Sequence, residues 1–272
     1  MSIEIVVPDD FPTVFAGSAA QARAQALGSV RVCSEQGAND SAELARRIGS
    51  ANVAINIRAY AHFTEAVFAA CPNLKLVSIW GVGTDNIDLA AAKKHGVTIC
   101  NTPGANAIAV AEHAIALMMS VARKIPQIDR DMRKGDWPRE MLGQLHGKTL
   151  AVFGLGAIGS HVAMLARAFG MNVLEWRARS SSAADKDAFL KQADFVSLHV
   201  RLTPETRGFI GTREFQLMKP EAILVNTGRG ALVDREALYD ALRRNRIAGA
   251  GLDVFHDEPL PAGDPVLGLA NT

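Results

Sequence analysis

The chain has 272 residues, of which 49% are hydrophobic, so it can bury the core of one large or two medium-sized domains. Its net charge is +1 and the charges are well mixed, which excludes the basic footprint of a nucleic-acid or anionic-membrane binder. Three widely spaced cysteines, Cys33, Cys71 and Cys100, fit neither a disulfide framework nor a zinc site and favour a reducing, cytoplasmic compartment. The expected partner is a small molecule or a second copy of the chain.

No segment reads as a signal peptide or a membrane span. The start of the chain has no basic region ahead of an apolar run, and residues 3–7 read as a strand. The longest apolar stretch, residues 107–122, is interrupted by Glu112 and His113, which predicts a buried helix.

The first hundred residues alternate between strand and helix patterns. This alternation predicts a parallel sheet covered on both faces, as in a small flavodoxin-like domain. The expected strands are residues 3–7, 30–33, 53–57, 76–79 and 97–100, and the expected helices are 16–27, 41–48, 64–70 and 89–95.

A second alternating series begins after Gly147 and predicts a Rossmann-type domain. Between the two series we expect a long helix to about residue 124 and a polar, irregular stretch over 131–147. The fold class is therefore α/β with two parallel-sheet domains, over residues 1–100 and 101–272, and a cleft between them is the expected ligand site. The expected strands of the second series are 150–153, 173–176, 195–198, 223–226 and 250–254, with helices at 157–169, 213–218 and 235–243.

The most informative motif is a dinucleotide-binding fingerprint, GxGxxG, at Gly154, Gly156 and Gly159. It follows an apolar strand and opens a helix, which is its proper setting. The first glycine allows a tight turn, the second lets backbone approach a pyrophosphate, and the third lets helix and strand pack closely. The free N–H groups at the start of the helix would then bind the phosphates.

Two further strand-to-turn segments could hold a carboxylate. The backbone N–H groups of residues 81–83 could bind one, or these glycines could simply form a turn. Arg229 stands between two glycines and could capture a carboxylate and polarise a carbonyl, or it could be a solvated loop arginine. The flanking glycines favour the functional interpretation of Arg229.

Two other positions are ambiguous by pattern alone. Glu258 could orient an imidazole and hold it protonated, but a loop carboxylate before a proline is the better interpretation of the pattern. His199, at a predicted strand end, is more typical of a structural than of a catalytic histidine.

Taken together, these segments resemble the D-isomer-specific 2-hydroxyacid dehydrogenases, which include phosphoglycerate, glyoxylate/hydroxypyruvate and D-lactate type enzymes. The resemblance runs from about residue 50 to the last residue and follows the family order. It implies a flavodoxin-like substrate domain, a Rossmann domain and hydride transfer between NAD(P)H and C2 of a small 2-oxo acid. The segments that carry it are GVGTDNID, NTPGANAIAVAEHAIAL, GKTLAVFGLGAIG, SLH followed by LTPET, LMKP, LVNTGRG, and GLDVF followed by EP.

The resemblance also implies roles for single residues. Arg229 would bind the substrate carboxylate and carbonyl, and Glu258 would pair with the catalytic histidine and raise its pKa. The backbone of Val82 and Gly83 would meet the substrate, and Arg58 could meet a second anionic group or be a surface arginine. No metal is implied. The cofactor set comprises Gly154, Gly156, Ala157, Ile158, Gly159, Arg177, Val200, Thr227 and Asp253.

The chain departs from the family pattern at its catalytic histidine. That histidine lies in a Pro-His pair a few residues past a motif ending in Asn, and Asn271 and Thr272 are the last residues given. His256 does not match its position. We therefore expect the 272-residue polypeptide to bind cofactor but to turn over poorly.

Two other departures concern the nucleotide domain. Arg177 occupies the place where NAD-preferring members carry an aspartate for the ribose 2′-OH, which favours NADP over NAD, or else Arg177 only covers the adenine. Arg201 stands where the family usually has a proline, two residues after His199 of the SLH segment. The sequence offers no functional explanation for this replacement.

The same fold carries several functions in different proteins, so alternatives to the dehydrogenase have to be considered. The main alternative is an NAD(P)-sensing, corepressor-like binding protein, and formate dehydrogenase ranks lower. Residues 133–137 resemble the arm through which family members dimerise, within an expected dimerisation segment around 125–147, so we expect a homodimer. Trp80 would line the substrate pocket or be a core residue.

Overall fold

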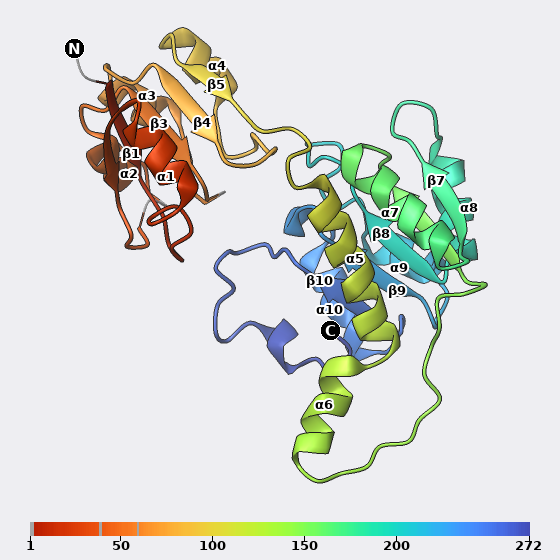
Figure 1. Cartoon of the computed structure of the whole chain (residues 1–272). Coiled ribbons are helices and arrows are strands. Elements are labelled where there is room, and N and C mark those ends of the chain that lie inside the picture. The colour runs from red at the N-terminus through yellow and green to blue at the C-terminus, as the bar shows by residue number, and fades with distance from the viewer. Residues whose placement is uncertain (1–2, 38–39, 59) are drawn as a thin grey trace. The chain divides into compact units, whose positions relative to one another are not determined.

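The computed structural model describes residues 3–37, 40–58 and 60–272 and divides into two compact units, residues 1–105 and 106–272. The division falls a few residues beyond the boundary expected from the sequence. Each unit contains one five-stranded parallel sheet with helices on its faces (Figure 1). No helix in the described ranges is long and apolar enough to cross a membrane.

The first unit has the flavodoxin-like strand order β2-β1-β3-β4-β5. Alternate residues of β1 supply both faces, because Val6 joins the core under α2 and α3 while Ile5 and Val7 join the core under α1. Its elements are β1 (Ile3–Val7), α1 (Ala19–Gln25), β2 (Gly28–Val32), α2 (Ser41–Ile48), β3 (Val53–Asn56), α3 (Glu65–Ala70), β4 (Leu76–Ile79), α4 (Leu89–Lys94) and β5 (Thr98–Cys100).

The second unit repeats this logic with the order β10-β9-β8-β6-β7. Leu150 and Val152 of β6 pack toward α5 and α7, whereas Ala151 and Phe153 face the core on the other side of the sheet. Its elements are α5 (Ala107–Ala122), α6 (Ile125–Arg133), β6 (Thr149–Phe153), α7 (Ala157–Ala168), β7 (Asn172–Trp176), α8 (Ala183–Gln192), β8 (Phe195–Leu198), α9 (Thr212–Leu217), β9 (Ile223–Asn226), α10 (Arg235–Arg243) and β10 (Gly249–Leu252).

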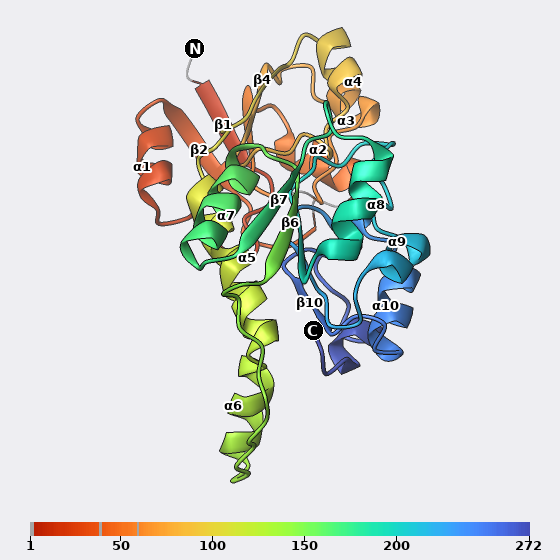
Figure 2. The ribbon, with the colours of Figure 1, turned by 90° about the vertical axis from the view of Figure 1, so that its right-hand side faces the viewer.

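Two helices of this unit were not predicted. Helix α6 begins directly after the expected long helix and reaches into residues 131–133, the start of the stretch expected to be irregular. It is separate from α5 because Lys124 adopts a left-handed φ of 49°. It projects from the rest of its unit (Figure 2) and buries none of its residues. Helix α8 begins at a capping box formed by Ser182 and Asp185, a signal that the sequence carries.

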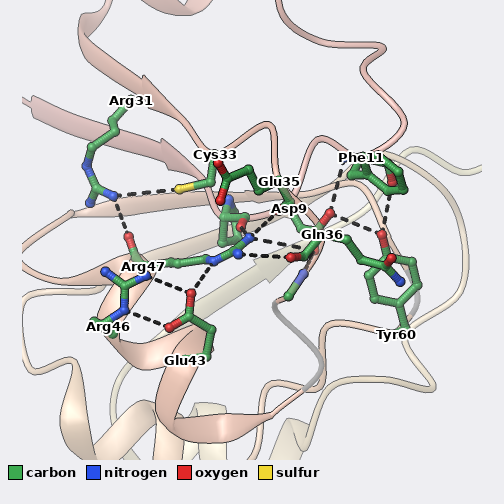
Figure 3. A network of polar contacts seen from close by, with 12 residues as sticks. Asp9, Phe11, Arg31, Cys33, Glu35, Gln36, Glu43, Arg46, Arg47 and Tyr60 are labelled. Atoms are coloured by element: carbon green, nitrogen blue, oxygen red, sulfur yellow. Dashed lines mark hydrogen bonds and ion pairs between the residues drawn. The ribbon is translucent and has the colours of Figure 1, made fainter.

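A buried arginine ties the end of β1 to α2 in the first unit (Figure 3). Arg47 donates to the carbonyl oxygens of Pro8 (2.8 Å) and Glu35 (2.6 Å). Its Nη1 lies 3.8 Å from Oδ2 of Asp9, and its Nε donates to Glu43 at 2.7 Å. Arg47 and Asp9 are only 7% and 2% exposed, so the burial of either charge depends on these contacts.

Replacing this arginine should destabilise the unit. The change Arg47→Ala removes the guanidinium beside the buried Asp9 carboxylate and takes a donor from two carbonyl groups, so we expect a loss of about 3 kcal/mol in the free energy of unfolding. Denaturant unfolding followed by circular dichroism measures it. Arg46→Ala is the matched control, because Arg46 binds the same Glu43 from an exposed position and should leave the midpoint almost unchanged. Equal losses in the two variants would contradict this account.

Candidate functional site

The glycine fingerprint forms the turn between β6 and α7. Phe153, the last residue of β6, is in register with Trp176 of β7 and Leu198 of β8, so the three strands end level with one another. Gly154 has a φ of +103°, and a Cβ on it would lie 2.6 Å from the carbonyl group of His199. A Cβ on Gly159 would lie 1.9 Å from the carbonyl oxygen of Gly154. Only glycine fits at these two positions, as the fingerprint requires.

Gly156 differs, because a Cβ there would meet nothing within 4 Å and its φ of −80° suits any residue. Protein packing therefore gives no reason for a glycine at this position. Gly156 is the N-cap of α7, and no side chain caps the helix. The first N–H groups of α7, from Ala157, Ile158 and Gly159, begin a twelve-residue helix whose dipole favours an anion. The open space beside Gly156 suits the approach of a phosphate.

Arg177 follows β7 at the same edge of the sheet. Its Nη2 donates to Oε2 of Glu175 at 2.9 Å, and Glu175 also accepts from Arg167 at 2.6 Å. The hydrogen bond from Arg167, and to a lesser extent the one from Arg177, holds the pKa of Glu175 below its usual range. The hydroxyl of Ser181 accepts from the backbone N–H of Arg177 at 3.0 Å, which shapes the turn. The guanidinium of Arg177 is thus anchored yet half-exposed.

The β8 exit contributes His199 and Val200. The imidazole of His199 shares a hydrogen bond of 2.8 Å with the hydroxyl of Ser197, and its burial lowers its pKa to about 4. It is therefore neutral at physiological pH. Its backbone N–H donates to the carbonyl oxygen of Phe153 at 2.7 Å. These contacts are those of a structural histidine, and Val200 beside it is buried.

Arg229 lies in the turn after β9. The side chain of Asn226 accepts from the N–H of Gly228 at 3.0 Å and donates to the carbonyl oxygen of Arg229 at 2.9 Å, which fixes the turn. A Cβ on Gly230 would lie 2.2 Å from the backbone of Phe255, so this turn packs directly on the loop after β10. Close packing thus requires glycine at position 230, whereas a Cβ on Gly228 would meet only the flexible end of the Leu232 side chain, at 3.0 Å.

Two polar groups lie beside that turn at the ends of β9 and β10. Thr227 is 8% exposed, and its hydroxyl oxygen is buried without a hydrogen-bond partner among the described residues, which is uncommon for a buried polar atom. Asp253 is half-exposed, and its Oδ1 lies 3.2 Å from Nε2 of His113 on α5. Sequence reasoning missed His113, because nothing in its helical pattern signals a contact with a strand end.

Glu258 is exposed in the loop after β10. Its Oε1 accepts from the backbone N–H of Phe255 at 2.9 Å, and within the described ranges no histidine side chain binds it. His256 contacts the carbonyl oxygen of Val233 at 2.8 Å, which makes it a structural group. The described part of the chain contains no cluster of three or more His, Cys, Asp or Glu side chains able to hold a metal.

The remaining site residues belong to the first unit. Arg58 follows β3 and donates to the carbonyl oxygen of Pro12, while its Nε is buried with no hydrogen-bond partner in the described part of the chain. The carbonyl oxygen of Val82 accepts from Asn101 at 2.8 Å, and Gly83 follows in the same turn. Trp80 is 45% exposed, so it is not a core residue.

Comparison with known proteins decides the family. A family model described as "D-isomer specific 2-hydroxyacid dehydrogenase, NAD binding domain" matches residues 115–272. The chain belongs to this family. Its second unit is therefore a nicotinamide-nucleotide domain, and the buried Thr227 hydroxyl and the open space at Gly156 fit such a ligand.

Individual relatives agree with this assignment. The chain is 44% identical to a glyoxylate reductase of Korarchaeum cryptofilum over 75% of this chain and 66% of the relative, and 42% identical to a D-3-phosphoglycerate dehydrogenase of Methanocaldococcus jannaschii over 84% and 46%. It therefore spans about two-thirds or less of these relatives. Among solved structures, an acyclic imino acid reductase in complex with NADPH and D-Arg superposes with a TM-score of 0.86 at 31% identity, covering 99% of this chain and 87% of that one.

The three glycines should respond differently to a methyl group. In Gly156→Ala the new Cβ meets no protein atom, so stability should fall by no more than about 1 kcal/mol, the cost of a poorer N-cap. The Kd for NADPH should rise about tenfold, because the methyl group occupies the space for the pyrophosphate. Gly159→Ala should instead lower the melting temperature through its clash with the backbone of Gly154. Thermal melts and calorimetric titration separate the two effects. Unchanged NADPH affinity in Gly156→Ala would contradict the site.

Proposed function

We propose that the protein is an oxidoreductase that transfers a hydride between NAD(P)H and a small 2-oxo acid, with NADPH preferred. The observation that carries the proposal is the edge of the second sheet. There the strand ends carry the glycine turn, Arg177 beside it, and Arg229 with Thr227 in the turn after β9. Because parallel strands end at one edge, cofactor-binding and carboxylate-binding groups meet there.

The residues have distinct tasks in this proposal. The N–H groups at the start of α7 bind the pyrophosphate, and the hydroxyl of Thr227 gains a partner from the nicotinamide end. Asp253, held beside His113, also faces that end. When bound, the nicotinamide supplies or accepts the hydride.

Arg229 acts on the substrate in this proposal. Its guanidinium binds the carboxylate and stabilises the negative charge that develops on the carbonyl oxygen. Glu258 would orient the proton-donating histidine that the resemblance implies, for which the described residues offer no counterpart. Arg58, Val82 and Gly83 are the further substrate contacts that the resemblance and the sequence pattern suggest. The preference for NADPH rests on Arg177, since a guanidinium suits a 2′-phosphate.

The proposal predicts which substrates and which cofactor the protein should use. The full-length protein should oxidise NADPH with glyoxylate or hydroxypyruvate, with a larger kcat/KM than for NADH. Arg229→Ala should lower kcat/KM for the 2-oxo acid by about a hundredfold, while the Kd for NADPH changes little. Arg244→Ala, at an exposed arginine of the same unit, is the control. Nucleotide binding without turnover of any 2-oxo acid would instead favour a nucleotide-sensing, corepressor-like protein.

We further propose that the protein is a homodimer formed through the arm of residues 125–147. The arm exposes large apolar side chains, Trp137 at 75% and Met141 at 98%, which monomers rarely leave in water. A groove of about 1020 Å³ adjoins it in the same unit and is lined in part by Leu117, Pro126 and Leu260. An apolar arm beside an apolar groove is the self-complementary surface of a twofold dimer.

Charges on the arm should therefore dissociate the dimer. Light scattering should give twice the chain mass for the unaltered protein and one chain mass for a Trp137→Asp, Met141→Asp double variant. Met164→Asp, at a 56% exposed position outside the arm and the groove, tests whether any new surface charge has this effect. A monomeric unaltered protein would contradict the proposed dimer.

A further inference from the structure

Arg201 lies at the point of the second sheet where a bound ligand is most expected. Strand β7 pairs with one side of β6 and β8 with the other, so the strand order changes direction between β6 and β8. In open parallel sheets, ligands bind in the crevice outside the strand ends at this switch point. Arg201 is in the loop that leaves β8, directly after His199 and Val200.

The backbone of this loop is fixed although the side chain of Arg201 is exposed. The hydroxyl of Thr206 donates to the carbonyl oxygen of Arg201 at 2.7 Å and accepts from the N–H of Thr203 at 2.8 Å. The start of the loop packs against Gly154, where the carbonyl group of His199 leaves room for no Cβ. The backbone position of Arg201 is therefore set before a ligand arrives, so only its side chain has to be ordered on binding.

The positive charge of Arg201 is not paired with a carboxylate among the described residues. Glu205 is the carboxylate nearest to Arg201 in the sequence of this loop. It accepts a hydrogen bond from the hydroxyl of Thr203 instead, which lowers the pKa of the Glu205 carboxyl. By contrast, Arg177 shares Glu175 with Arg167, so part of its charge is already neutralised. A dianionic phosphate at this edge needs positive charge beyond that of Arg177, and Arg201 supplies it.

Geometry places both arginines within reach of one phosphate. Neighbouring strands lie about 4.8 Å apart, so the ends of β7 and β8 are separated by roughly 10 Å across β6. Arg177 and Arg201 follow these strands on the two sides of the Gly154 turn, beyond strand ends that are level with one another. The guanidinium of Arg177 lies against Glu175 of β7 and would turn toward β8 to share a phosphate. Two arginine side chains can close that gap around a single phosphate group.

We propose that Arg201 is a second cationic contact for the ribose 2′-phosphate of NADPH, on the opposite side of the Gly154 turn from Arg177. It rests on the proposed preference for NADPH. It also gives a role to the replacement of the usual proline, because proline has no charge to offer a phosphate.

The experiment uses binding rather than turnover. The protein is titrated calorimetrically with 2′,5′-ADP and with 5′-AMP, which differ by the 2′-phosphate alone. Arg201→Ala should raise the Kd for 2′,5′-ADP about tenfold while changing that for 5′-AMP less than about twofold. Arg201→Lys should recover part of the loss. Arg207→Ala, at another exposed arginine of the same loop, should leave both values unchanged.

The outcomes separate this inference from the proposal on which it depends. If the unaltered protein binds 2′,5′-ADP more tightly than 5′-AMP, Arg177→Ala removes the difference and Arg201→Ala does not, then only the role of Arg201 is overturned. If the unaltered protein binds both nucleotides equally, the NADPH preference fails and the role of Arg201 with it. Equal weakening of both nucleotides by Arg201→Ala would show a general contact, which also overturns the role proposed here.

Discussion

The second unit depends on the close approach of backbone at the end of β6. Gly159 lies so near the carbonyl oxygen of Gly154 that a Cβ would come within 1.9 Å, and a Cβ on Gly154 would come within 2.6 Å of the carbonyl group of His199. These two approaches bring the start of α7 and the exits of β6 and β8 to one point. A phosphate can reach the N–H groups of the helix because no described side chain caps them and the space beside Gly156 is open.

A second close approach of backbone at a glycine occurs near the ends of β9 and β10, on the same edge of the sheet. A Cβ on Gly230 would lie 2.2 Å from the backbone of Phe255, so the turn that carries Arg229 is held against the loop after β10. In the proposed function, the glycine turn and Arg177 hold the phosphate end of the cofactor. The ends of β9 and β10 hold its reactive end beside the substrate. The strand order β10-β9-β8-β6-β7 then sets the direction in which the cofactor lies.

Local patterns in the sequence were sufficient for the two parallel sheets and for the glycine turn, because apolar runs and glycine spacing are local signals. The family resemblance is confirmed by the match over residues 115–272. Helix α8 could have been found from its capping box. Helix α6 also carries local signals, Pro126 in its first turn and an amphipathic pattern, although it buries none of its residues. Contacts between distant segments, such as His113 with Asp253, leave no trace in a single sequence.

A crystal structure of the protein with NADPH tests the central claim most directly. The account predicts the pyrophosphate against Gly156 and the first N–H groups of α7, the 2′-phosphate on the side of Arg177, and the nicotinamide beside Thr227 and Asp253. A nucleotide bound away from the end of β6, or with its nicotinamide on the side of Arg177, would contradict it.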